Sequence, residues 1–323
     1  MPRNDGPGND RIVGIDVAKA KVDCCIRALS ARLSSPRTPA GERELIGWLR
    51  SNGVKMAVME ASGGYEQRWA QALREAGIAV RIVDPKRVRH FAKSAGRLAK
   101  NDPIDAEMIA WFAETFPAAP DQIHDAEREE LDMLVTARAG LLKLSTQIGN
   151  RGEHAQPPTV ERAHKAVLKT LAAQLAKLEA AIAAKLDATA QFVERTAIIE
   201  SVPGLARQTA AGLIAKMPEL GRASGKVIAA LLGAAPYDDD SGTHRGERHI
   251  KGGRQNLRNL FYMATLGAAT QHNPVLKAYY QRLRAKGKEP KVALVACMRK
   301  LIVILNTMIA RGAKWDPTKH VLA

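Results

Sequence analysis

Apolar and polar residues alternate near the start of the chain, as is typical of half-buried β-strands. Residues 11–29 predict two strands joined by a tight connection near residues 18–20. Residues 30–40, which contain two prolines, predict a turn or an edge strand. Further along, residues 54–61 predict a buried strand and residues 78–85 predict another.

Helical periodicity separates and follows these strands. Residues 42–52 and residues 63–77 each predict a helix, and residues 102–116 predict the last helix of this region. Asp102 is suited to cap that last helix, and Pro103 is suited to its first turn. The order of strands and helices predicts a mixed α/β sheet.

The second part of the chain has the pattern of long helices. Residues 126–149 and 160–190 predict two helices, separated by a helix-breaking stretch at residues 150–159. Apolar residues recur at heptad spacing on the second helix: Leu168, Leu171, Leu175, Leu178 and Ile182. A seam of about two heptads fits a helical hairpin packed within one chain and fits an oligomer contact equally well, so both interpretations stay open.

From Ile198 onward the pattern is again globular and mostly helical. A turn at Pro203–Gly204 separates two apolar helices, as in a helix-hairpin-helix motif, whose turn offers backbone N–H groups to a phosphate. Gly204 is therefore a candidate nucleic-acid contact, with an ordinary pair of packed helices as the alternative. We expect three parts along the chain, which are residues 11–120, 125–195 and 196–323.

Composition excludes several classes of protein. The chain has 323 residues, of which 46% are hydrophobic and 25% charged, which excludes a mostly disordered or fibrous protein. Its three cysteines are too few for a disulfide framework, so we expect a cytoplasmic setting. Charges such as Arg299 and Lys300 interrupt the longest apolar stretches, so we expect no membrane span.

Positive charge is concentrated in two regions. The net charge is +16, and from Ser241 to the end 16 Lys and Arg face three acids, a net of +13. Residues 86–100 form a second basic stretch without an acid. Clustered positive charge favours a nucleic-acid partner, the alternative being a solvated surface. The candidate nucleic-acid-binding residues are Lys86, Arg87, Arg89, Lys93, Arg97, Arg245, Arg248, Lys251, Arg254 and Arg258.

Four acids of the first region stand in positions that are unusual for a charge. Asp16 lies in an apolar strand, Glu60 ends another, and Asp102 and Asp105 share one face of a helix. Carboxylates on neighbouring elements suit a two-metal phosphoryl-transfer centre holding Mg²⁺ or Mn²⁺. Taken singly, each acid could instead cap a helix, end a strand or pair with a nearby cation.

The motifs that contain these acids resemble a known family. IVGIDVAK, VMEASGGYE and KNDPIDA are similar to the acidic signature of RuvC-like, RNase H-type nuclease domains, and more closely to DEDD transposases of insertion-sequence elements. Those transposases are described as bridge-RNA-guided recombinases. The segment SGTHRGERHIKGGRQNLRNLFYMAT, from Ser241, and the preceding VPGL and TAAGLIA segments resemble the same family. The resemblance covers about residues 11–315.

The resemblance implies a specific architecture and chemistry. It implies a RuvC-like (RNase H-like) α/β domain, a helical hairpin or coiled coil, and a mostly α-helical transposase domain. It implies that the four acids bind metal and that Ser241 is the nucleophile that forms a covalent link with DNA. The implied partners are donor and target DNA, a guide (bridge) RNA and further copies of the chain, as a dimer or tetramer, in a bacterial cytoplasm.

Other classes of protein share some of these features. An actin-like or sugar-kinase ATPase also opens with a Gly-Ile-Asp strand, but the chain shows no second phosphate-binding hairpin. A structure-selective junction nuclease would use the same four acids with water as the nucleophile. A non-enzymatic nucleic-acid-binding protein would use the acids structurally. A metal-dependent covalent protein–DNA adduct separates the transposase from all of these.

Overall fold

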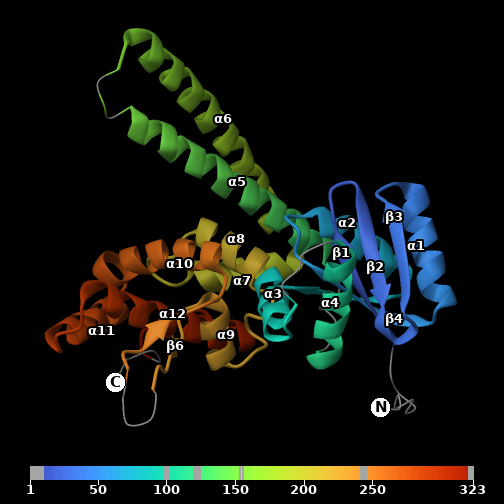
Figure 1. The fold of residues 1–323 in the computed structure, drawn as a ribbon. Coiled ribbons are helices and arrows are strands. Elements are labelled where there is room, and N and C mark those ends of the chain that lie inside the picture. Colours follow the sequence, from blue (N-terminus) through green and yellow to red (C-terminus); the bar gives the residue numbers. More distant parts are fainter. Residues whose placement is uncertain are drawn as a thin grey trace. The chain divides into compact units, whose positions relative to one another are not determined.

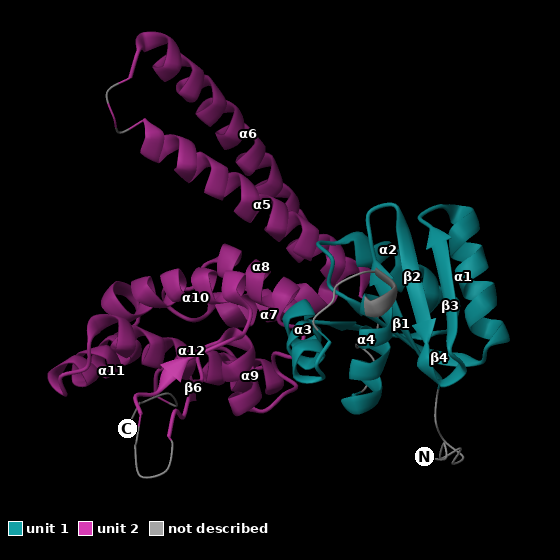
Figure 2. Ribbon diagram, viewed as in Figure 1, with its two compact units in different colours: residues 1–124 teal, residues 125–323 magenta. Residues whose placement is uncertain are grey.

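The computed structural model describes residues 11–97, 102–118, 125–152, 154, 156–240 and 246–318, and only the backbone of residues 102–104. The chain divides into two compact units, residues 1–124 (unit 1) and residues 125–323 (unit 2), which Figure 2 colours separately. Unit 1 contains a mixed sheet and unit 2 is mostly helical, so the predicted fold classes of the two parts are confirmed. The hairpin helices belong to unit 2, and the finer three-part division stays a prediction.

Unit 1 is a five-stranded sheet with helices on both faces (Figure 1). Its strands are β1 (Arg11–Val17), β2 (Lys21–Ile26), β3 (Ala31–Pro36), β4 (Val54–Glu60) and β5 (Ala79–Val83). Its helices are α1 (Pro39–Ser51), α2 (Tyr65–Glu75), α3 (Pro85–Ser94) and α4 (Asp102–Thr115), with a 3-10 turn at Arg27–Leu29. The strand order is β3-β2-β1-β4-β5, and β1 is antiparallel to β2 but parallel to β4. The stretch predicted as a turn or edge strand is thus the edge strand β3.

Alternation along the strands divides the core of unit 1 between the two faces of the sheet. Val13 and Ile15 of β1 pack with α1 and α2, whose buried residues include Leu49 and Trp69. On the other face, Val58 of β4 packs with residues of α3 and α4: Val88, Ala92, Met108, Ile109, Phe112 and Ala113. Because successive side chains of a strand point to opposite faces of the sheet and both sets are buried, both faces must be covered, and the four helices cover them.

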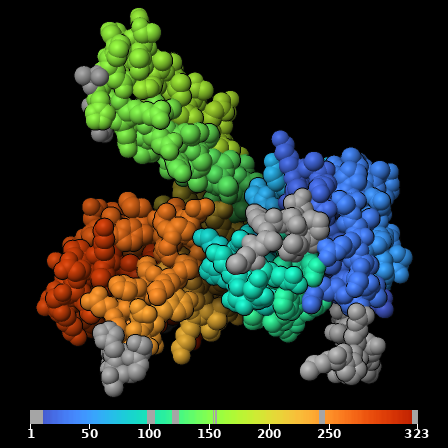
Figure 3. All heavy atoms as spheres, viewed as in Figure 1, coloured from blue at the N-terminus to red at the C-terminus, as the bar shows by residue number. Residues whose placement is uncertain are grey.

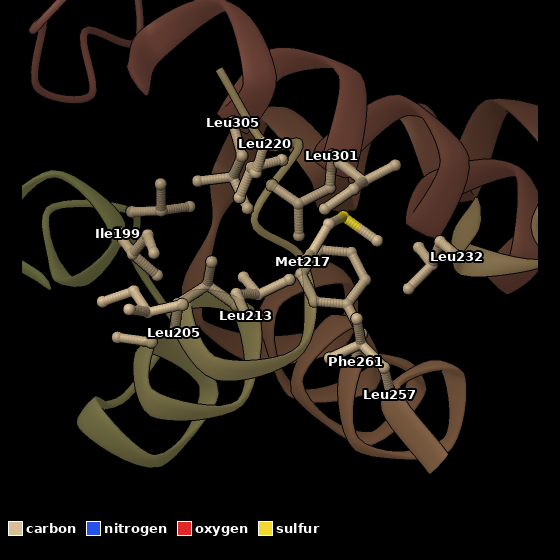
Figure 4. Packing of buried hydrophobic residues seen from close by; sticks show 14 of the residues in the cluster. Ile199, Leu205, Leu213, Met217, Leu220, Leu232, Leu257, Phe261, Leu301 and Leu305 are labelled. Atoms are coloured by element: carbon tan, nitrogen blue, oxygen red, sulfur yellow. The ribbon is translucent and has the colours of Figure 1, made fainter. Parts of the chain in front are cut away.

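Unit 2 consists of helices and one short pair of strands. Its helices are α5 (Ala126–Arg151), α6 (Pro158–Ala188), α7 (Ala190–Glu200), α8 (Arg207–Lys216), α9 (Gly225–Leu232), α10 (Gln255–Gly267), α11 (Pro274–Ala285) and α12 (Pro290–Ala310). A π-helical segment, Ala268–His272, joins α10 to α11. The short strands β6 (Pro236–Tyr237) and β7 (His249–Ile250) pair with each other. Leu and Ile side chains from α7, α8, α10 and α12 meet in one core around Met217 and Phe261 (Figure 4).

Helices α5 and α6 form a hairpin that stands clear of the rest of unit 2 over much of its length (Figure 3). The predicted heptad seam is a half-buried row on α6, which packs against α5, and its last member, Ile182, is fully buried. An ion pair between Arg138 and Glu179, 2.6 Å apart, also joins the two helices. The seam therefore serves the intrachain packing that was one of its two interpretations.

Helix α12 is the one described helix that is long and apolar enough to cross a membrane. Half of its apolar window is buried inside unit 2, where Cys297, Leu301 and Leu305 belong to the core. Arg299 and Lys300 are exposed side by side in the middle of the helix. This is the pattern of a core helix that has one solvent-exposed face.

Candidate active site

Two of the four candidate acids lie at the carboxyl ends of neighbouring parallel strands. Asp16 is the penultimate residue of β1, and Glu60 is the last residue of β4. Ile15 and Met59 are register partners and both face the core beneath α1 and α2. Because side chains alternate along a strand, Asp16 and Glu60 point to the opposite face, which α3 and α4 cover.

Helix α4 lies directly on this face of the sheet. A Cβ atom added to Gly14 would lie 2.2 Å from the carbonyl oxygen of Ala106 and 2.4 Å from the amide nitrogen of Ala110. Near the other end of α4, Glu114 pairs with Arg27, which follows β2 and so lies beside the start of β1. The first turn of α4, with Asp105, therefore lies toward the end of β1 that carries Asp16.

A cavity of about 350 Å³ opens between the end of β4, helix α3 and the first turns of α4. Glu60 and Asp105 both line it, so the structure brings these two predicted acids to one site. The remaining wall is formed mainly by α3 and consists of Pro85, Lys86, Val88, Arg89, His90, Ala92 and Lys93, together with Met108 of α4. Asp102 begins α4 one turn before Asp105, and its side chain is outside the described part of the chain.

The wall formed by α3 is basic. Asp84 fixes the start of this helix by accepting a hydrogen bond from the backbone nitrogen of Lys86, at 2.9 Å. Lys86, Arg89 and Lys93 then project from successive turns into the cavity lining. Acids on one side and cations on the other suit a ligand that carries a phosphate and a bridging metal ion. Arg87 instead stacks over the ring of Phe112, 5.3 Å from its centroid, and Arg97 is exposed beyond the end of the helix.

The metal-binding capacity of this site rests on its donor chemistry. Among the side chains that the structure describes, no group of three or more His, Cys, Asp or Glu stands close enough to hold an ion. Glu60 and Asp105 do supply carboxylate oxygens to one cavity, which is the donor type that Mg²⁺ and Mn²⁺ prefer. The quartet of Asp16, Glu60, Asp102 and Asp105 thus stays a prediction, in which Glu60 and Asp105 line the cavity and Asp16 is not among the lining residues.

A fifth acid, Asp23, stands next to the predicted quartet. It is the register partner of Asp16 on β2, it is 8% exposed, and its carboxylate forms an ion pair with Lys21 at 2.8 Å. Burial, followed by the negative charges of Asp23, Cys25 and Asp16, raises the pKa of the Cys24 thiol far above its ordinary value. Asp23 is not among the residues predicted from the sequence, and its place on the same face of the sheet as Asp16 follows from the register of β1 and β2.

Ser241 and Arg245 lie outside the described residues, but the segments on either side of them are defined. Tyr237 of β6 pairs with His249 of β7. Beyond that pair, Asp238 forms an ion pair with Arg248 at 2.6 Å, so one charge of the acidic run before Ser241 is matched. A Cβ atom added to Gly246 would lie 2.4 Å from the carbonyl oxygen of Asp239, which shows how closely the two arms approach.

Several predicted nucleic-acid contacts of unit 2 have partners inside the chain. Arg254 donates two hydrogen bonds to Glu219, at 2.7 and 2.6 Å. Arg258 donates to the carbonyl oxygens of Gly233, at 3.2 Å, and Gly252, at 2.8 Å. These two guanidinium groups thus bind partners within unit 2, and their binding of nucleic acid stays a prediction. Lys251, by contrast, is exposed.

The predicted turn at Gly204 is present between α7 and α8. Gly204 has a φ of +92°, and a Cβ atom added there would lie 2.7 Å from the Cα of Ala268 in the π-helical segment. Both facts require glycine for packing and backbone conformation. Phosphate binding at this turn stays a prediction.

Comparison with known proteins identifies the family. A family model described as transposase, of the DEDD type of IS110 elements, matches residues 13–155. A second model, described as transposase of the IS116/IS110/IS902 family, matches residues 196–281. The first model thus includes Asp16, Glu60, Asp102 and Asp105, and the second includes Ser241.

Curated relatives agree with these models. A "Pilin gene-inverting protein" of Moraxella bovis is 23% identical over 330 residues, covering 95% of this chain and 98% of that protein. A protein of the same name from Moraxella lacunata matches to the same extent. A "Probable family 20 transposase" of Pseudomonas aeruginosa is 25% identical over 238 residues, covering 64% of this chain and 65% of that protein. With two matching models in the order expected from the sequence motifs, the chain belongs to the IS110 family of DNA transposases and recombinases.

Proposed function

We propose that the protein cuts and rejoins DNA through a covalent link between Ser241 and a DNA phosphate, with metal assistance from the acids of unit 1. The observation that carries the proposal is the cavity in which Glu60 and Asp105 face the basic side chains of α3. A scissile phosphate bound there would meet cations that neutralise its charge and carboxylates that can share a metal ion with it. Phosphoryl transfer depends chiefly on such positioning and electrostatic stabilisation.

Asp16, Glu60, Asp102 and Asp105 would hold Mg²⁺ or Mn²⁺. When bound, the ion stabilises the negative charge that builds up on the phosphate oxygens. The protein's own contribution is geometric. The register of β1 and β4 fixes two of the carboxylates, and the close contact of α4 with Gly14 fixes the helix that carries the other two.

Serine chemistry accounts for rejoining as well as cutting. The Ser241 oxygen forms a bond to phosphorus while the bond from phosphorus to the leaving deoxyribose oxygen breaks. The serine proton passes to a base or to water, and the leaving oxygen takes up a proton. The phosphoester to serine preserves the bond energy, so a second DNA end can attack it and release Ser241.

The remaining partners follow from the same proposal. Donor and target DNA would contact the exposed cations, among which Lys86, Arg89 and Lys93 border the cavity. A guide RNA would select the target by base pairing, outside the protein. A homo-oligomer, dimer or tetramer, would use apolar side chains that the α5–α6 hairpin leaves exposed, among them Met133, Leu142, Leu144 and Val167. Light scattering on the purified protein measures that assembly directly.

The experiment that tests the proposal is a denaturing gel of labelled DNA incubated with the protein, Mg²⁺ and any guide RNA. The wild type should give a labelled band that migrates with the protein and disappears on proteolysis. Ser241→Ala should lose both this band and cleavage while it still binds DNA. Asp105→Asn should lose them as well, because it removes a ligand charge without changing shape.

Matched control variants distinguish the loss of a site residue from a general loss of folding. Glu107→Gln makes the same type of change on the same helix, at a residue that pairs with Arg32 on β3, and should keep the labelled band. Ser51→Ala removes an exposed hydroxyl from the end of α1 and should also keep it. Undiminished cutting by Ser241→Ala without a protein-linked band would refute the serine intermediate and favour the water-dependent junction nuclease. DNA binding with neither cutting nor adduct in the wild type would favour a non-enzymatic binding protein.

A further inference from the structure

The segment directly after Glu60 is held in place by a buried carboxylate. Glu66, in the first turn of α2, is 5% exposed. One of its oxygens, Oε2, accepts three hydrogen bonds: from the backbone nitrogen of Ser62 at 2.9 Å, from the Ser62 hydroxyl at 3.0 Å, and from the backbone nitrogen of Gly64 at 2.9 Å. By accepting three hydrogen bonds at one oxygen, this side chain holds together the turn that leads from β4 to α2.

Packing restrains the two glycines of this turn only weakly. Gly63 and Gly64 have φ values of +72° and +102°, and a Cβ atom added to either would meet nothing within 4 Å. A turn of two glycines in open space has high conformational freedom in the absence of other restraints. The hydrogen bonds to Glu66 supply those restraints, and bonds to a buried carboxylate are the stronger, charge-assisted kind.

The turn begins at Ser62, two residues after Glu60, so its conformation bears directly on that side chain. On its N-terminal side, Glu60 is fixed by the sheet, because it is the register partner of Val83 on β5. Ala61 extends the pairing by donating its N–H to the carbonyl oxygen of Val83, at 3.1 Å. Beyond Ala61 the sheet ends, and the next restraint on the chain is the set of bonds from Ser62 and Gly64 to Glu66.

We propose that Glu66 is a positioning residue for Glu60, which fixes the turn after β4 so that the Glu60 carboxylate enters the cavity in the orientation needed to bind a divalent metal ion. The inference rests on the proposed metal-binding role of Glu60. Glu66 itself is not a ligand in this scheme. Its Oε2 is committed to the three donors, and its helix packs through Trp69, Ala70 and Leu73 on the face of the sheet opposite to the cavity.

The test measures metal binding without relying on catalysis. The full-length protein is titrated with Mn²⁺, and the rise of the thermal unfolding temperature is recorded against Mn²⁺ concentration, with free Mn²⁺ measured by EPR as a second readout. Glu66→Ala should raise the half-saturating Mn²⁺ concentration by about tenfold or more, the usual loss when a residue supporting a metal ligand is removed. Glu66→Gln keeps an oxygen at this position, so its loss should stay below about tenfold.

Two further variants keep the test decisive if Glu66→Ala folds poorly. Ser62→Ala removes only the hydroxyl bond and leaves both backbone bonds, so it should lie between the wild type and Glu66→Ala. Glu75→Ala is the matched control, since it removes an exposed glutamate from the last turn of the same helix and should leave the Mn²⁺ titration unchanged. Unfolding temperatures without metal report any general loss of stability separately.

Each outcome decides between the inference and the function on which it rests. A normal Mn²⁺ titration for folded Glu66→Ala, beside a wild type that binds and an Asp105→Asn variant that does not, overturns the positioning role alone. Equal losses for Glu66→Gln and Glu66→Ala, together with a wild-type titration for Ser62→Ala, would mean that the Glu66 charge acts on the metal directly and not through the turn, which also overturns it. A wild type that shows no Mn²⁺ response overturns the metal site, and the inference with it.

Discussion

Replacement of Gly14 by alanine tests whether the contact between α4 and β1 sets the geometry of the site. The added Cβ would lie 2.2 Å from the carbonyl oxygen of Ala106 and 2.4 Å from the nitrogen of Ala110. Both are backbone atoms of α4, so a side-chain rotation cannot relieve the overlap. Carbon–oxygen contacts ordinarily begin at about 3.3 Å, so α4 must move away from the sheet by about 1 Å.

This displacement should affect stability and rate separately. Overpacking of this kind costs about 1–3 kcal/mol of the free energy of unfolding. Since α4 carries Asp105, a shift of about 1 Å also misplaces an acid of the proposed metal site, and displacements of that size cost about 100-fold in rate. The loss of rate should therefore persist at temperatures where the variant is fully folded.

The assay pairs urea denaturation, followed by circular dichroism, with the rate of adduct formation on labelled DNA. Gly47→Ala is the matched control, because Gly47 lies exposed in α1 and a Cβ atom added there meets nothing within 4 Å. It should raise the free energy of unfolding by up to about 1 kcal/mol and leave the rate unchanged. A Gly14→Ala variant with the wild-type midpoint and the wild-type rate would refute the reasoning.

Three further predictions concern unit 2. Burial raises the pKa of Glu219, but its hydrogen bonds with Arg254 and the charge of Arg254 outweigh burial and lower the pKa below its ordinary value. Glu219→Gln should thus lower the free energy of unfolding by about 1 kcal/mol at pH 7, and urea midpoints should converge with the wild type as pH falls through that lowered pKa. Gly204→Ala, with its positive φ and its contact with Ala268, should cost about 1–3 kcal/mol in the same denaturation assay. Arg258→Ala should reduce adduct formation by loosening the base of the β6–β7 segment while the salt dependence of DNA binding is kept; a slope reduced by about 1 would instead indicate a phosphate contact.

Local patterns were sufficient to predict most elements of unit 1. The alternation in residues 11–29 and the apolar run before Glu60 correspond to β1, β2 and β4, and the proline-containing stretch corresponds to the edge strand β3. These features depend on near neighbours along the chain, so the sequence expresses them directly. The helix α3 was not predicted, because its charged residues dominate the pattern and only Val88 and Ala92 are fully buried in the core.

The partners of the arginines in unit 2 could not be predicted from neighbouring residues. A basic cluster predicts phosphate contacts, and it does so equally for every cation in it. Arg254 meets Glu219, 35 residues away, and Arg258 meets a carbonyl 25 residues away. Such pairings depend on how helices pack in three dimensions, which no spacing between neighbouring charges reveals.

The sequence by itself determined the candidate residues of the proposed site: four carboxylates in the order of a known family, a serine motif, and two basic stretches. Only the tertiary structure decided how these parts are used. The parallel register of β1 and β4 turned Asp16 and Glu60 to one face, and the absence of a side chain at Gly14 let α4 bring Asp105 to the same cavity as Glu60. Glu66 appears in the sequence as an ordinary acid in the first turn of a helix, and its role emerges only because folding buries it against the turn that follows Glu60. Side-chain chemistry is a property of each residue alone, whereas direction, burial and contact arise when distant segments pack together.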